Sequence, residues 1–245
     1  DFFAKSLNVY TSAIKAYFNI DEFRKSDSKY DWTIEQLVRL PIEWYGGADL
    51  SKLHDLTAAC LFGNYKGVDI IIPHAWFPVT AAAKKADEDN IPLFGWMDDG
   101  WLEMPNTPSM NPAEPVAQFK KWRDEGFKIK KVGHDRKFAR PYVAAMKKAK
   151  FTVVDQPQLA VAKSEGFRYI EHKAKIGCLY YCHAEPFLYC VGNVKAVKDD
   201  EIVIYEKIED NKRIDVFDAA VFASIRYLID TEKIADAAAW FGDDD

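Results

Sequence analysis

The chain has 245 residues, of which 49% are hydrophobic and 14% aromatic, enough to bury a full globular core and unlike a disordered chain. Its longest apolar run, GVDIIIP, falls well short of the roughly 20 residues that a membrane-spanning helix needs. The formal net charge of −5 argues against a protein that binds nucleic acid over its whole surface.

The four cysteines, Cys60, Cys178, Cys182 and Cys190, lack the CxxC spacing of zinc or redox motifs. A domain of this size does not need disulfides, so we predict reduced thiols in a cytosolic protein. The chain begins with Asp1 rather than Met, which suggests a fragment of a longer protein.

The first part of the chain is predicted to be a helical lead-in followed by a meander of strands. Residues 2–25 and 33–40 have helical patterns, and together they define a lead-in over residues 1–40. A strand ending at Asp49 follows, and then strands over residues 56–63 and 67–77, which the turn GNYKG joins as an antiparallel hairpin.

Residues 80–115 are rich in Pro, Asn, Asp and Met, a composition that predicts a long irregular excursion. An amphipathic helix is expected over residues 115–126, because Val116, Phe119 and Trp122 form one apolar stripe. It leads into FKIKKVGHD, a fourth strand that ends in Asp135.

A helix over residues 141–150 and the strand FTVVDQP complete a β-α-β unit, whose strands should be parallel and adjacent. An apolar helix and a hairpin that includes EIVIYEK come next, and RIDVFDAAVFASIRYLI is a closing helix. Hairpins followed by β-α-β predict an α/β fold with a mixed sheet that carries helices on its faces.

Carboxylates stand at the places where such a fold puts a ligand site. Asp49 and Asp135 end strands, and ligands bind beyond the carboxyl ends of the strands in α/β sheets. Asp215 and Asp218 lie on one face near the start of the closing helix. Asp at a strand end can also serve only the turn, and an acid at a helix start can serve only the helix dipole.

The segment over residues 120–150 is strongly basic, with about a dozen Lys and Arg side chains against about three acidic ones. These side chains either cover solvated helix faces or form a local strip that binds phosphate. The candidates for DNA binding are Lys120, Lys121, Arg136, Lys137 and Arg140.

Four segments in this order, YGGADLSKLHDLTA, VGHDRKFA, CHAEPFLYCVGNVKAVKDD and KRIDVFDAAVFAS, resemble the successive motifs of the nuclease domain of tailed-phage terminase large subunits, which are RNase H-like nucleases. The likeness runs over residues 3–228. It implies a nuclease domain over residues 41–245 and a lead-in that resembles the exit segment from an ATPase domain. No G-x-x-x-x-G-K-[ST] occurs, so the ATPase motor of the family is absent from this chain.

The resemblance implies a metal-dependent endonuclease that cuts concatemeric double-stranded viral DNA during genome packaging into procapsids. Asp49, Asp135 and Asp215 match the family's metal-binding aspartates, with Asp218 as an alternative or additional helix ligand. Asp55 and His134 are candidates for supporting the ligands, against a structural or surface role. The implied partners are double-stranded DNA, the portal protein, the small terminase subunit and the ATPase domain of the full-length chain, in the host cytoplasm and without a membrane.

The chemistry explains the clustering independently. Carboxylates packed together repel one another unless cations neutralise them. Two Mg²⁺ or Mn²⁺ ions roughly 3.5–4 Å apart can activate a water and stabilise the leaving oxygen. No protein nucleophile is then required, in agreement with the lack of a G-x-S-x-G motif.

Three other readings stay open. A glycoside hydrolase would use paired carboxylates such as Asp98 and Asp99 in MDDGWLE. A DNA-gripping or motor-coupling module would bind DNA without cutting it, and another RNase H-like nuclease or recombinase would share the carboxylates. Metal dependence separates the first two from a nuclease, because a glycosidase needs no divalent ion and a gripping module does not cut.

Overall fold

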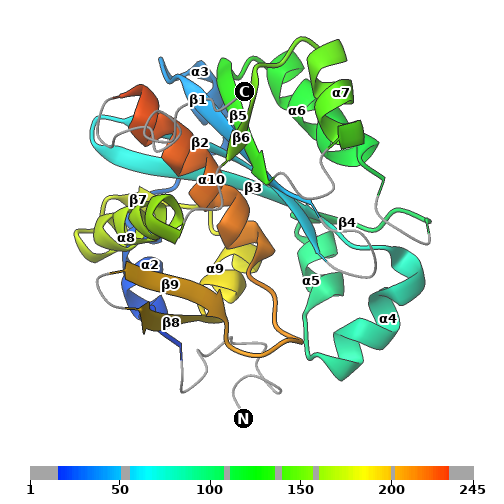
Figure 1. Ribbon diagram of the computed structural model, residues 1–245. Helices are drawn as coiled ribbons and strands as arrows, with labels where there is room; N and C mark the ends of the chain where they lie inside the picture. The colour runs from blue at the N-terminus through cyan, green and yellow to red at the C-terminus, as the bar shows by residue number, and fades with distance from the viewer. Residues whose placement is uncertain are drawn as a thin grey trace, which may run out of the picture.

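The computed structural model describes residues 16–50, 56–107, 111–135, 140–156, 160–199 and 202–231. Its centre is a mixed sheet in the order β4-β3-β2-β1-β5-β6, with β7 paired to β3 (Figure 1). The strands of this sheet are β1 (Trp44–Asp49), β2 (Thr57–Tyr65), β3 (Val68–Trp76), β4 (Leu102–Glu103), β5 (Ile129–Asp135), β6 (Val153–Gln156) and β7 (Leu179–Tyr180). A separate hairpin consists of β8 (Val194–Asp199) and β9 (Ile202–Lys207).

Helices cover both faces of the sheet. On one face the core includes residues of α2 (Ile20–Asp27), α8 (Ala160–Lys175), α9 (Glu185–Val191) and α10 (Asp215–Asp230), and α10 crosses the middle of the sheet (Figure 1). The opposite face is packed by α3 (Ile34–Arg39), α6 (Ala113–Glu125) and α7 (Arg140–Lys148). The predicted mixed sheet with helices on both faces is therefore confirmed.

The predicted hairpins and the β-α-β unit are also confirmed. β1, β2 and β3 form an antiparallel meander, whereas β5 pairs in parallel with both β1 and β6. The loop between β2 and β3 has only two residues, Lys66 at φ 49° and Gly67 at φ 87°. Positive φ at both positions is the geometry of the two-residue turns whose twist matches a β-hairpin.

The prediction of a long irregular excursion over residues 80–115 is wrong. This segment includes most of α4 (Val79–Glu88), all of α5 (Leu93–Asp98) and the short strand β4. The loop-forming residues lie at the helix ends, where Pro78 and Pro92 precede the first turns and Asn90, at φ 52°, follows α4. They therefore mark helix boundaries and not a continuous loop.

The described part of the lead-in packs into the main core. Phe18 and Phe23 are buried with residues of α8, α9 and α10. Ser26 Oγ donates to the carbonyl oxygen of Leu179 at 2.7 Å and accepts the N–H of the same residue at 2.8 Å. Residues 1–15 lie outside the described residues, and the domain boundary at residue 40 stays a prediction.

All four cysteines lie within the described residues. All four cysteines are free thiols; Cys60, Cys182 and Cys190 are buried and Cys178 is partly exposed. Within the ranges given above, every helix is too short or too polar to cross a membrane.

Candidate functional site

The two strand-end aspartates meet at one edge of the sheet. β1 and β5 are parallel neighbours, and Ala48 pairs with His134. Asp49 and Asp135 are the next residues along, and each ends its strand. Because side chains alternate across a strand, they point to the same face as Gly47 and Gly133, which lie against α10.

Glycine lets α10 lie directly on the strands. A Cβ atom on Gly47 would overlap the carbonyl oxygen of Ala219 and lie 2.6 Å from the backbone nitrogen of Ala223. Real Cβ atoms do not approach backbone so closely, so any side chain at this position would push the helix away. Gly47 in YGGAD thus lets α10 lie close to β1, whereas Gly46 faces Phe119 and Val132 on the opposite side of the sheet.

The first turn of α10 carries the other two aspartates. Asp215 and Asp218 are each only 7% exposed, and both lie at the helix N-terminus, where the backbone dipole favours negative charge. The thiol of Cys60 donates to the carbonyl oxygen of Val216 at 3.4 Å. This contact ties the first turn of the helix to the second strand of the meander.

The four carboxylates share one electrostatic environment. Burial raises the pKa of Asp49 well above its usual range, and the charges of Asp215, Asp218 and Asp135 raise it further. The ammonium of Lys163 acts in the opposite direction. A buried carboxyl group whose pKa is shifted by neighbouring charges is typical of functional sites.

Lys163 belongs to this site, although the sequence motifs do not contain it. Its Nζ donates to Oδ2 of Asp218 at 2.7 Å and lies 5.7 Å from the ring centres of Phe167 and Phe222. Burial acts to lower the pKa of Lys163, but Asp218, Asp49 and Asp135 outweigh it, and the pKa is raised.

A signal for Lys163 was present in the sequence. Lys163, Phe167, Ile170 and Ala174 follow the spacing of one helical face, so a lysine extends an apolar stripe of α8. A lysine at such a position requires an acidic partner, because lysine is almost never fully buried unless it is paired.

The carboxylates fit a hard divalent cation. They offer only oxygen ligands, the type that Mg²⁺ and Mn²⁺ prefer. Oδ1 of Asp218 is buried and has no hydrogen-bond partner within the described structure. Among the described side chains, no three from His, Cys, Asp and Glu are arranged as a ready metal site.

His134 lies on the other side of the sheet from Asp135. Its Nε2 is 3.0 Å from Oδ1 of Asp155, its ring contacts that of Tyr142 in α7, and it is only 1% exposed. Burial lowers the pKa of His134, although Asp155 opposes this shift. The structure thus gives His134 a packing position beneath α7. Asp55 lies outside the described residues.

The structure describes three of the five predicted DNA-binding residues, and these three lie on two different helices. Arg140 is exposed at the start of α7, five positions after Asp135 in the sequence. Lys120 and Lys121 are exposed on α6, in a shallow hollow that they share with Asp124 and Glu125. Arg136 and Lys137 lie outside the described residues.

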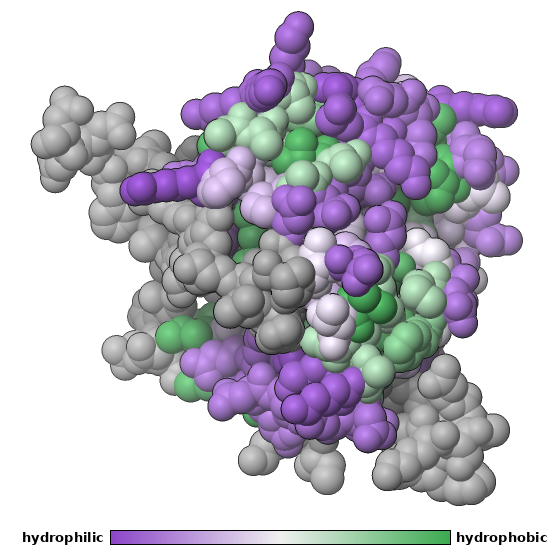
Figure 2. Space-filling view, turned by 90° about the vertical axis from the view of Figure 1, so that its right-hand side faces the viewer, coloured by the Kyte–Doolittle hydropathy of each residue, from purple (hydrophilic) through white to green (hydrophobic). Residues whose placement is uncertain are grey.

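The surface on this side of the molecule is mixed in character. Figure 2 looks at the side that carries α4, α5, α6 and α7, and it shows hydrophilic residues with apolar residues between them. The basic side chains of α6 therefore do not belong to a uniform hydrophilic face, and the DNA-binding roles of the strip stay predictions.

The acids considered for a glycosidase lie on the surface at the end of a helix. Asp98 ends α5 and Asp99 caps it, and both are exposed. A neighbouring hollow of about 690 Å³ is lined by residues that include His74, Glu103 and Trp122. The hydrogen bond and charge of His74 hold the pKa of Glu103 below its usual range, whereas a general acid needs a raised pKa.

Comparisons with known proteins point to one class of protein. No family model matches the chain. The chain is 32% identical over 78 residues to the terminase large subunit of Enterobacteria phage HK97, a match that spans 31% of this chain and 16% of that protein. The crystal structure of the HK97 large terminase matches with a TM-score of 0.75 at 20% identity, over 92% of this chain and 46% of that one.

The nuclease of the large terminase from thermophilic phage G20c has a similar fold. Its structure matches with a TM-score of 0.51 at 10% identity, over 76% of this chain and 82% of that one. The structure of the same nuclease with bound magnesium matches with a TM-score of 0.50 at 11% identity, over the same shares. The predicted resemblance and the RNase H-like fold are therefore confirmed, and the chain spans about half of the HK97 protein.

Proposed function

We propose that this chain is the nuclease part of a phage terminase large subunit, a metal-dependent endonuclease that cuts concatemeric double-stranded viral DNA during packaging. The observation that carries the proposal is the meeting of Asp49, Asp135, Asp215 and Asp218 at one edge of a sheet with the terminase nuclease fold. The magnesium in the G20c nuclease structure supports it.

The four aspartates would hold two divalent ions, Mg²⁺ or Mn²⁺. When bound, such ions supply an activated water, hold the scissile phosphate and stabilise the leaving 3′ oxygen. The chain itself contributes position and charge: Gly47 lets α10 present Asp215 and Asp218 beside Asp49, and Asp49 has to be unprotonated to bind a cation. Arg140, which is exposed and follows Asp135 by five positions in the sequence, would bind the DNA backbone without reading its sequence.

The resemblance also suggests the wider context of this activity. As parts of the same proposal, the partners are the ATPase domain of the full-length chain, the portal protein and the small terminase subunit. The place of action is the procapsid portal in the host cytoplasm.

Plasmid cleavage tests the function directly. With Mn²⁺ or Mg²⁺, the purified chain should nick and then linearise supercoiled plasmid with little sequence preference, and EDTA should stop the reaction. Cleavage that resists EDTA contradicts the metal mechanism. Metal-independent binding without any cleavage at high protein concentration would instead indicate a DNA-gripping module.

A further inference from the structure

Among the residues that the structure describes, the candidate site contains one ammonium group and four carboxylates. Lys163 reaches it from α8, a helix that carries none of the motifs, and its side chain is only 20% exposed. Its 2.7 Å contact is with Asp218, and its charge also acts on Asp49 and Asp135. In the described structure, Lys163 therefore stands where a cation is needed.

The surroundings of Lys163 hold it in this place. The rings of Phe167 and Phe222 each lie 5.7 Å from its Nζ, which favours a cation there. Asp218 in turn is 10% exposed at its side chain, and a carboxylate this buried is costly without a partner. The pair is thus mutually stabilised, and it engages one of the two oxygens of Asp218.

We propose that Lys163 is a positioning residue that neutralises Asp218 in the metal-free protein and competes with divalent cations for this carboxylate. Asp218 then joins the metal site only when Lys163 gives way. This inference rests on the proposed function, since it assumes that the carboxylates bind a cation.

Calorimetric titration of the metal-free chain with Mn²⁺ tests the inference without measuring cleavage. Lys163→Met should bind Mn²⁺ about tenfold more tightly than the unmodified chain, because removing one positive charge favours a second cation. Its melting temperature without metal should fall, and the rise on adding Mn²⁺ should be larger. Lys163→Gln, which keeps a hydrogen-bond donor, makes the same prediction if Lys163→Met does not fold.

Two controls separate direct competition from a general charge effect. Lys131→Met also removes one positive charge near α10, but from a 2.6 Å pair with Asp230, and it should leave Mn²⁺ affinity unchanged. In an Asp218→Asn background, replacing Lys163 should change the affinity by clearly less than tenfold, because only its weaker action on Asp49 and Asp135 remains.

The results discriminate between the two proposals. Equal Mn²⁺ affinity with and without Lys163, or a full gain in the Asp218→Asn background, overturns the competition. Failure of the unmodified chain and of Lys163→Met alike to bind Mn²⁺ overturns the proposed metal site itself.

Discussion

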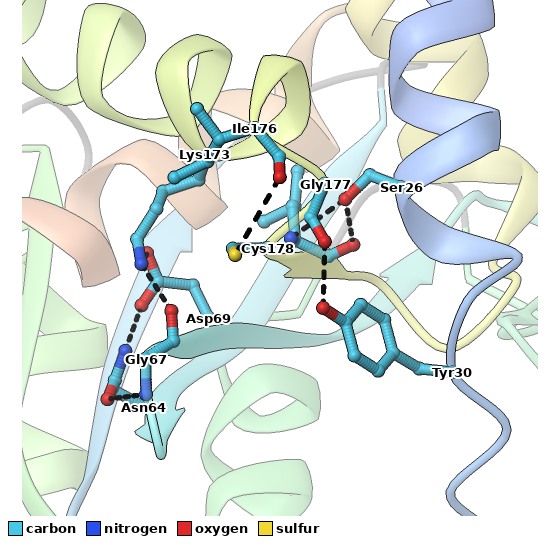
Figure 3. A network of polar contacts seen from close by, with 10 residues as sticks. Ser26, Tyr30, Asn64, Gly67, Asp69, Lys173, Ile176, Gly177 and Cys178 are labelled. Atoms are coloured by element: carbon cyan, nitrogen blue, oxygen red, sulfur yellow. Dashed lines mark hydrogen bonds and ion pairs between the residues drawn. The ribbon is translucent and has the colours of Figure 1, made fainter.

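Acidic side chains are buried at both ends of the central sheet, singly and paired with a lysine at one end and as a cluster at the other. At the turn end, Asp69 is fully buried at the start of β3, where Asn64 Nδ2 donates to its Oδ1 at 2.5 Å and Lys173 Nζ lies 3.6 Å from its Oδ2 (Figure 3). Lys173 Nζ also donates to the carbonyl oxygen of Gly67 at 2.5 Å. One acid, one cation and fixed donors therefore close the hairpin.

At the other end of the sheet, the described residues place four carboxylates around one ammonium group. The helix α8 supplies the lysine in both places, Lys173 to the turn end and Lys163 to the carboxylate edge. At the turn end, the positive charge of Lys173 balances the negative charge of Asp69, so these polar groups stabilise the fold. The carboxylate edge carries excess like charge, which costs stability and creates affinity for cations, as expected where a site is kept for function.

The largest expected effect is on activity at the carboxylate edge. Asp49→Asn keeps the shape of the side chain but removes the charge that holds the cation, so plasmid cleavage in Mn²⁺ should fall below detection. Stability without metal should hold or rise by about 1 kcal/mol, because one repulsive charge is gone. Asp135→Asn should behave alike. Normal cleavage together with a lower melting temperature would make Asp49 a turn residue.

The same substitution at the turn end should have the opposite sign. Asp69→Asn leaves Lys173, whose side chain is only 13% exposed, without its carboxylate. Breaking a buried charge pair in this way should lower the free energy of unfolding by about 3 kcal/mol. Urea denaturation measures this loss, and cleavage per folded molecule should stay normal. Equal stability of variant and parent would remove the contrast between the two ends.

A smaller loss is expected where α10 touches the sheet. Gly47→Ala adds a methyl group against the backbone of Ala219 and Ala223, and this overpacking should cost about 1–3 kcal/mol. Cleavage should also fall, because the helix that carries Asp215 moves. Gly95→Ala in α5 is the matched control: nothing lies within 4 Å of the added atom, so stability should rise slightly. Equal melting of both variants would contradict the close approach.

The strands and the carboxylate edge could be predicted because their signals are local. The turn GNYKG and the strand ends at Asp49 and Asp135 are readable within a few residues. Alternation along a strand also places His134 opposite Asp135, so its position beneath α7 was available from the sequence.

Two features of the structure were not predicted from the sequence: the helices α4 and α5, and the contact between Lys163 and Asp218. The helices α4 and α5 were hidden because their bounding Pro and Asn residues are also loop formers. Lys163 meets Asp218 because α8 and α10 pack on the same face of the sheet; the spacing of α8 indicates that Lys163 needs an acidic partner, but it does not identify that partner. The metal-binding roles of the four aspartates stay predictions that the variants above test.

The smallest expected effect concerns DNA binding beside the carboxylate edge. Arg140 is exposed at the start of α7, five positions after Asp135 in the sequence, whereas Lys120 and Lys121 share their surface with Asp124 and Glu125. Each lost phosphate contact lowers the slope of log affinity against log salt by about one unit. We expect Arg140→Ala to lower this slope by about that amount for unrelated DNA sequences, measured by fluorescence anisotropy in Ca²⁺ to prevent cutting.

Lys120→Ala should lower the slope less, because neighbouring acids already offset the charge of Lys120. An unchanged slope for Arg140→Ala would mean that this arginine makes no phosphate contact and that other residues bind the DNA.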